Sequence, residues 1–182
     1  MKFFNLAISG SYLIQQSVLT DERGFFARFY CKEEFSKAGL VTEFPQMSNS
    51  LSVERGTLRG FHYQLPPAGE TKVLSCFRGG LHVNLLDLQP NSPTFGKTVG
   101  VSISGNSQEA IYVPEGVANA FLTLEPDTAV FYLTSKPYTP ELERGIRWND
   151  PNFDIQWPFE PFVISEKDAN HPNFNFADHS VG

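Results

Sequence analysis

The chain has 182 residues, a formal net charge of −6, 41% hydrophobic residues and 19% charged residues. This composition is too apolar for a disordered chain and too acidic for a general nucleic-acid-binding protein, which needs a basic face. The length predicts a single domain over residues 1–182, with its core at about residues 21–168 and a flexible end at residues 169–182.

The part of the chain before Lys72 contains one clear element, a short helix over residues 32–38. The helix ends at Gly39, and glycine suits the left-handed conformation that often closes a helix.

Short apolar stretches follow one another from Lys72 onward, each ended by a turn signal such as Gly79-Gly80. Aromatic residues make up 14% of the chain, which also has 14 glycines and 13 prolines, and these residue types favour strands and tight turns. We therefore expect an antiparallel sandwich or barrel. The expected strands are residues 72–78, 81–88, 97–104, 110–113, 120–124 and 129–134.

Two further patterns concern the surface of this barrel. His82 and Asn84 alternate with apolar residues on one strand, so they face either solvent or a lumen that holds a ligand. The C-terminal segment is rich in proline and aromatic residues, so we expect it to wrap back onto the barrel until about Asp168. The remainder, from His171 to Gly182, is expected to fray.

Polar residues gather in residues 55–64 with nearby Lys72, in residues 131–146 and in residues 164–168. These segments contain the histidine, tyrosine, lysine, arginine and carboxylate groups that serve in proton transfer and anion binding. The composition alone does not say whether the segments meet in space.

Several motifs occur in order between about Asp21 and Asp168. They are Asp21-Glu22-Arg23-Gly24-Phe25-Phe26, Arg59-Gly60-Phe61-His62-Tyr63-Gln64, Ser92-Pro93-Thr94-Phe95-Gly96-Lys97, Pro114-Glu115-Gly116-Val117-Ala118-Asn119-Ala120-Phe121 and Trp148-Asn149-Asp150-Pro151. Together they resemble the dTDP-4-dehydrorhamnose 3,5-epimerase family. The resemblance implies an all-β, cupin-type jelly-roll barrel with short peripheral helices. It also implies a homodimer, no cofactor and a nucleotide-linked 4-keto-6-deoxysugar as substrate.

The resemblance assigns a chemistry as well. The ketone at C4 of such a sugar acidifies the hydrogens at C3 and C5, so a base can remove one and an acid can return a proton to the opposite face. By resemblance, His62 is the base and Asp168 orients it. Tyr132 is the acid, and Lys72 faces the C4 oxygen, where negative charge develops.

Ten further residues are implied to bind the substrate. The candidates for the diphosphate are Arg23, Gln46, Arg59 and Lys167. The candidates that flank the base with flat apolar surfaces are Phe26 and Tyr138. The remaining candidates are Arg28, Asn49, Asn119 and Glu143.

The sequence departs from the family at three places. Asn119 stands where the family usually has histidine, and Ser48-Asn49 stands where it usually has Asn-His. The pocket therefore lacks two imidazoles, which asparagine cannot replace as proton carriers. Arg28 stands where the rhamnose-pathway enzymes usually have glutamate, near the nucleotide base of a partner subunit. These departures favour an epimerase that inverts C3, with C5 and the nucleotide (dTDP, CDP or GDP) left open.

Two alternatives remain. One is the 3,5-epimerase of dTDP-4-keto-6-deoxyglucose in rhamnose synthesis. The other is a non-catalytic cupin that binds sugar nucleotides, which the departures at Ser48, Asn49 and Asn119 favour and the retained His62 and Tyr132 oppose.

No metal site is expected. Metal-binding cupins place histidines where this chain has His82 and Asn119, and one imidazole is too few for a zinc or iron site. His171 and His179 come too late in the chain to complete the set.

The chain shows no targeting or anchoring signal. Its N-terminus lacks a long apolar leader, and no stretch reaches the roughly 18 apolar residues of a membrane span. Cys31 and Cys76 are too few for a disulfide scaffold. We expect a soluble cytoplasmic protein with reduced cysteines and no membrane partner.

Overall fold

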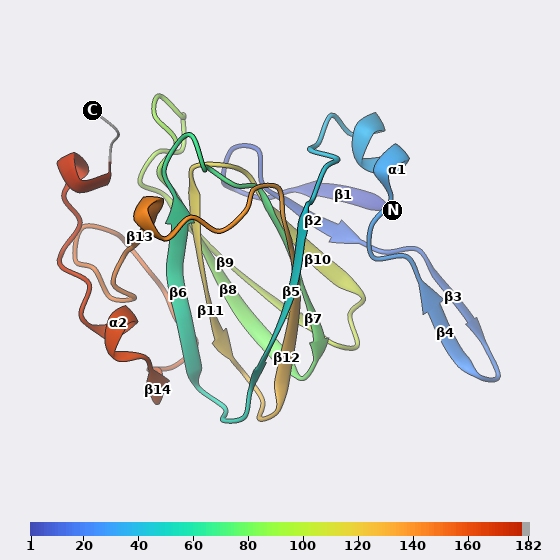
Figure 1. The fold of residues 1–182 in the computed structure, drawn as a ribbon. Coiled ribbons are helices and arrows are strands. Elements are labelled where there is room, and N and C mark those ends of the chain that lie inside the picture. Colours follow the sequence, from blue (N-terminus) through green and yellow to red (C-terminus); the bar gives the residue numbers. More distant parts are fainter. Residues whose placement is uncertain (180–182) are drawn as a thin grey trace.

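Two β-sheets pack face to face in the computed structural model, which describes residues 1–179 (Figure 1). In spatial order, the first sheet contains β1 (Lys2–Asn5), β2 (Tyr12–Gln15), β10 (Glu109–Val113), β7 (Lys72–Arg78), β12 (Thr128–Thr134) and β5 (Gln46–Ser52). The second contains β13 (Glu143–Gly145), β6 (Thr57–Gln64), β11 (Val117–Thr123), β8 (Gly80–Asp87) and β9 (Thr98–Ser104), with β14 (Val163–Ile164) parallel to β6.

The core lies between these sheets. Leu81, Val83 and Leu85 alternate along β8 and pack with Leu74 of β7 and Val113 of β10. This alternation is the two-residue period of a strand with one face buried. The arrangement confirms the expected all-β fold, a cupin-type jelly-roll barrel whose short helices lie at the periphery.

One helix and several strands match the sequence-based expectation, whereas α2 (Glu166–Ala169) was not located from the sequence. The helix α1 (Lys32–Lys37) ends before Gly39, which has a φ of +72° as expected. The predicted strand 72–78 coincides with β7, whereas the strand predicted at 120–124 begins earlier, at Val117.

The strands before Lys72 were not predicted, including β6, which carries His62. Phe61, Tyr63 and Leu65 form a second apolar cluster with residues of the C-terminal segment such as Trp157. Because β6 is covered on both faces, its sequence does not alternate simply between polar and apolar residues.

His82 and Asn84 lie on the outer face of β8, opposite the inward-facing leucines. His82 Nδ1 lies 2.9 Å from Ser102 Oγ, and Asn84 Nδ2 donates to Gln156 O at 2.8 Å. The His82 ring also contacts the edge of Trp157. These residues therefore line neither a lumen nor a solvent-exposed face, but anchor the C-terminal segment.

The C-terminal segment wraps onto the barrel as expected. Trp157 Nε1 donates to Trp148 O at 2.9 Å, and the helix α2 (Glu166–Ala169) sits beside β6. The tail continues to a 3₁₀ turn, η2 (Phe176–His179), where His179 Nδ1 lies 2.6 Å from the Tyr63 hydroxyl. These contacts give no sign of the fraying expected from His171 onward. Residues 180–182 lie outside the described part, so the flexibility of this end stays a prediction.

A hairpin of β3 (Val18–Asp21) and β4 (Gly24–Ala27) extends away from the barrel (Figure 1). Leu19, Phe25 and Phe26 on this hairpin, here called the arm, are 70%, 60% and 64% exposed. No helix among residues 1–179 is long and apolar enough to cross a membrane.

Candidate active site

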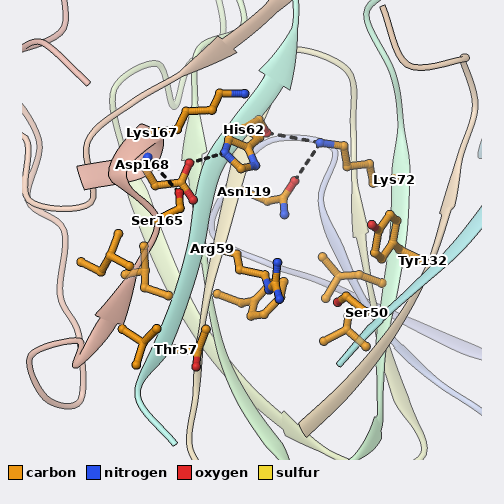
Figure 2. A pocket seen from close by; sticks show the side chains of 16 residues that line it. Ser50, Thr57, Arg59, His62, Lys72, Asn119, Tyr132, Ser165, Lys167 and Asp168 are labelled. Carbon is orange, nitrogen blue, oxygen red and sulfur yellow. Dashed lines mark hydrogen bonds and ion pairs between the residues drawn. The ribbon is translucent and has the colours of Figure 1, made fainter. Parts of the chain in front are cut away.

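A cavity of about 580 Å³ opens between the two sheets (Figure 2). His62 of β6 and Asn119 of β11 line one side, and Lys72 of β7 and Tyr132 of β12 line the other. A second hollow of about 350 Å³ adjoins it and shares His62, Lys72 and Tyr132. The structure thus brings together polar segments that are far apart in the sequence.

His62 and Asp168 form a hydrogen-bonded pair. His62 Nε2 lies 2.7 Å from Asp168 Oδ1, and the two side chains are 32% and 6% exposed. Because Nε2 is engaged with the carboxylate, Nδ1 is the ring nitrogen left for a substrate proton. A buried carboxylate on one imidazole nitrogen fixes the tautomer and stabilises the imidazolium, so the geometry suits a general base.

Local structure holds Asp168 in this position. Ser165 caps α2 by accepting a hydrogen bond from the Asp168 backbone N–H at 3.1 Å, and the Gly60 N–H donates to Asp168 Oδ2 at 3.2 Å. Gly60 has a φ of +105°, and a Cβ there would lie 2.6 Å from Asn119 O. Only glycine therefore allows β6 and β11 to approach while directing this N–H to the carboxylate.

The carboxyl group of Asp168 is held ionised. Its burial opposes ionisation and is the largest single effect, but the hydrogen bond and charge of His62 act in the other direction. Together with the Gly60 N–H and Ser165, they bring the pKa of Asp168 below its ordinary value.

Lys72 is fixed by acceptors on three sides. Its Nζ forms an ion pair with Glu70 Oε1 at 2.8 Å and donates to His62 O and Asn119 Oδ1 at 3.3 Å each. An ammonium group has three N–H donors, so all of them are engaged. Lys72 therefore supplies positive charge to the cavity, and a substrate oxygen must displace one of these acceptors to receive a direct hydrogen bond.

Tyr132 lies across the cavity from His62 (Figure 2). Its ring packs against the core, and no residue in the described range 1–179 hydrogen-bonds its hydroxyl. A tyrosine that is only structural ordinarily satisfies its hydroxyl within the protein. The free hydroxyl is therefore available to a bound ligand.

A chain of hydrogen bonds links four predicted binding residues beside the cavity. Gln46 Oε1 accepts from the Tyr138 N–H at 2.9 Å, the Tyr138 hydroxyl donates to Glu143 Oε2 at 2.9 Å, and Lys167 forms an ion pair with Glu143. The hydrogen bond to Glu143 raises the pKa of Lys167. Arg59 lines the larger cavity and donates to Ser52 Oγ at 3.3 Å.

Four predicted binding residues lie outside the cavity. Asn49 is exposed, because strand alternation on β5 turns its neighbours Ser48 and Ser50 toward the two hollows instead. The other three residues lie on or next to the arm and line neither hollow: Arg23, Phe26 and Arg28. Arg23 is paired with Asp21, and Arg28 Nη1 lies 3.9 Å from Glu34 Oε1.

Two residues near the cavity were missed or set aside in the sequence. Glu70, the partner of Lys72, follows a proline-rich turn and carries no motif signal. His171 lies close to Asp168, with Nε2 3.9 Å from Oδ1, and burial lowers its pKa despite the opposing charge of Asp168. His171 was set aside as a ligand for a site at His82 and Asn119, and it lies instead beside Asp168, because α2 returns the tail to β6.

The chain matches characterised proteins over nearly its whole length. Residues 5–175 match the family model described as dTDP-4-dehydrorhamnose 3,5-epimerase. A dTDP-4-dehydrorhamnose 3,5-epimerase from Shigella flexneri is 36% identical over 182 residues, covering 100% of both chains.

Solved structures agree with this match. The dTDP-4-dehydrorhamnose 3,5-epimerase from Bacillus anthracis, with TDP and PPi bound, has a TM-score of 0.91 and 33% identity, covering 95% of this chain and 99% of that one. A 3′-monoepimerase from Streptomyces bikiniensis, in complex with dTDP-quinovose, has a TM-score of 0.85 and 33% identity, covering 92% of this chain and 85% of that one. By sequence, fold and full-length coverage, the chain belongs to the dTDP-4-dehydrorhamnose 3,5-epimerase family.

Proposed function

We propose that the chain inverts C3 and C5 of dTDP-4-keto-6-deoxyglucose. The sequence alone favoured inversion of C3, with C5 and the nucleotide left open, and kept this reaction as an alternative. The family description and the full-length relative both name C3 and C5, which supports the alternative. The chain is in either case a carbohydrate epimerase, an isomerase.

One observation carries the mechanism: a carboxylate-paired imidazole and an unbonded phenol line the same cavity from opposite sides. His62 approaches from β6 with Asp168 behind it, and Tyr132 approaches from β12 (Figure 2). Epimerisation needs a base on one face of the sugar and an acid on the other. This arrangement also weighs against a non-catalytic binding protein.

The proposed reaction runs in two proton transfers at each centre. His62 Nδ1 takes the proton from the carbon next to the ketone, the C–H electron pair forms the enolate, and Asp168 stabilises the imidazolium. The Tyr132 hydroxyl then donates its proton to the opposite face as the ketone reforms. Proton exchange with solvent restores the tyrosine and the histidine.

Negative charge that develops on the C4 oxygen is stabilised by Lys72. The Lys72 side chain is only 16% exposed, so its charge acts more strongly than it would in bulk water. Asn119 turns its Oδ1 to Lys72, which leaves its amide nitrogen as a donor toward the cavity (Figure 2). We propose that this N–H group substitutes in part for the histidine that the family usually has here.

The nucleotide is proposed to bind between two copies of the chain. Arg59 and Lys167 lie at the cavity, whereas Arg23, Phe26 and Arg28 lie on or beside the arm. The exposed Leu19, Phe25 and Phe26 support burial of the arm against a partner. A homodimer would let one copy's arm complete the other copy's site.

Deuterium incorporation tests the proposed reaction. The protein is incubated in heavy water with freshly made dTDP-4-keto-6-deoxyglucose, and the incorporated deuterium is counted by mass spectrometry. Incorporation at both C3 and C5 is expected. Incorporation of one deuterium would support an epimerase that inverts C3 alone. No incorporation with the dTDP, CDP and GDP forms would reject the epimerase reaction for these substrates.

We further propose that the protein needs no dissociable cofactor and is located in the cytoplasm. Activity is expected to survive exhaustive dialysis against a chelator, and fractionation is expected to place the protein with cytoplasmic markers. Activity that requires an added metal or nucleotide cofactor would contradict the first part.

A further inference from the structure

Three potential metal ligands meet on the side of His62 that faces away from the substrate nitrogen. One ligand atom from each of His62, Asp168 and His171 lies within 4.8 Å of the other two. The separations from Asp168 Oδ1 are 2.7 Å to His62 Nε2 and 3.9 Å to His171 Nε2. Two imidazoles and a carboxylate are therefore gathered around one point.

His171 is placed there without a partner of its own. Its Nε2 is buried and has no hydrogen-bond partner among residues 1–179. Gly145, which pairs with His62 between β13 and β6, makes room for the ring, because a Cβ at Gly145 would lie 2.0 Å from this nitrogen. A buried polar nitrogen without a partner is costly, so its position beside Asp168 calls for a ligand.

The donor set fits a borderline transition-metal ion. Three-residue sites of two histidines and one carboxylate, with a further position open, hold Zn²⁺ and Fe²⁺ in proteins. Ligand distances of about 2.0–2.2 Å place neighbouring donor atoms roughly 3.3–3.5 Å apart around a zinc ion. The His62–Asp168 separation of 2.7 Å must therefore widen, and the Asp168–His171 separation of 3.9 Å must shorten, by amounts that side-chain rotation can supply.

We propose that His62, Asp168 and His171 form an inhibitory site for a divalent transition-metal ion such as Zn²⁺. Binding at this site stands independently of the proposed reaction. The inhibition rests on it, because it requires that His62 act as the base.

Inhibition follows from the tautomers of imidazole. A neutral imidazole carries one N–H, and a metal ion needs a lone pair. When the ion binds Nε2, the Nε2–H bond breaks, a proton is carried on Nδ1 instead, and the ion loses bound water. Nδ1 then has no lone pair to accept a substrate proton, while the substrate cavity itself stays open.

Metal binding is tested first, with Zn²⁺ alone. Chelator-treated protein is titrated calorimetrically, and one equivalent is expected to bind. His171→Ala should weaken binding by more than the roughly 10- to 100-fold that loss of an outer-shell partner costs. His82→Ala is the matched control, because it removes an imidazole of the outer face of β8, and it should bind like the wild type.

Equal affinity in the wild type and in His171→Ala, or no binding to the wild type, would overturn the site. His171→Asn provides a second variant, and thermal unfolding of both variants shows whether each is folded. If only one variant is folded, its affinity decides the outcome.

The deuterium assay tests inhibition. Chelator-treated His171→Ala should keep its basal exchange and resist Zn²⁺, whereas the wild type should lose exchange and still bind dTDP. Equal inhibition of both proteins, or Zn²⁺ that displaces dTDP, would overturn the tautomer mechanism. If the chelator-treated wild type shows no exchange at all, the proposed reaction fails, and calorimetry still decides the metal site.

Discussion

The residues predicted to act on the substrate lie in two regions that differ in how the chain holds them. Around His62, side chains are held by contacts between different elements, because Asp168 of α2 bonds the His62 ring and accepts from the Gly60 N–H of β6. On the arm, Arg23 pairs with Asp21 of the same hairpin, and Phe26 is 64% exposed. One chain therefore holds all the side chains of the proposed proton transfer, whereas the arm's Leu19, Phe25 and Phe26 stay exposed among residues 1–179.

The largest expected effect lies in the first region. His62→Ala should lower C3 deuterium exchange by at least the roughly 10² to 10⁴ that a positioned base contributes, because no other imidazole among residues 1–179 lines the cavity. Binding of dTDP should remain, since the phosphate candidates Arg59 and Lys167 are untouched. Retained exchange would remove His62 from the role of base.

Tyr132→Phe tests the proposed acid on the opposite wall of the same cavity. Net inversion should fall by about 10² or more, while loss of the C3 proton to solvent falls less, because the hydroxyl acts only after the proton is removed. The two rates are compared in one sample by mass spectrometry and by NMR of the product. Equal losses would make Tyr132 a positioning residue.

Substitutions on the arm test whether a partner subunit buries this region. Leu19→Ser combined with Phe25→Ser should convert a dimer to monomers in sedimentation and raise KM for the nucleotide sugar by roughly tenfold or more, because these side chains would leave a buried interface. Phe77→Ser is the control, because Phe77 is 80% exposed and lies on β7 rather than on the arm. A monomeric wild type with full activity would contradict the dimeric site.

Arg28 tests which nucleotide the arm selects. Arg28→Glu should improve binding of dTDP relative to CDP and GDP by about 5- to 20-fold, since the change reverses a charge at the expected base contact. Calorimetric titration with the three nucleotides measures the ratio. If wild-type protein already binds dTDP more tightly than CDP and GDP, Arg28 does not select against thymidine.

The smallest effect concerns stability outside both regions. Burial lowers the pKa of His82 and of His179, so both bind a proton less readily in the folded chain than in the unfolded chain. Below the ordinary pKa of about 6.5, the unfolded chain binds protons more readily than the folded chain does. The free energy of unfolding therefore decreases as the pH is lowered, by at most about 1.4 kcal/mol per pH unit for each histidine. Above this pH the contribution should be flat.

Urea unfolding between about pH 8 and about pH 5 measures this dependence. His179→Phe should make the decline shallower, because phenylalanine preserves the ring contacts with Tyr63 and Phe174 without titrating. A decline of unchanged slope in this variant would mean that His179 does not contribute.

The sequence predicted much of the barrel and the identity of its key side chains. Strand periodicity from Lys72 onward is local, so β7 and its neighbours could be predicted from adjacent residues. Asn49 was named through the family resemblance, whereas the alternation along β5 turns Ser48 and Ser50 toward the hollows and leaves Asn49 exposed. His62 and Asp168 were identified through motifs of the family rather than through any pattern of spacing.

Tertiary structure alone decided which groups touch. His62 and Asp168 are 106 positions apart, and their 2.7 Å contact depends on the C-terminal segment returning to β6 through contacts such as Asn84 with Gln156. The same return brings His171 next to Asp168, a contact that the position of His171 in the chain did not predict. Sequence patterns report which face of an element is apolar, whereas long-range contacts are set by how whole elements pack, and packing is a property of all of them together.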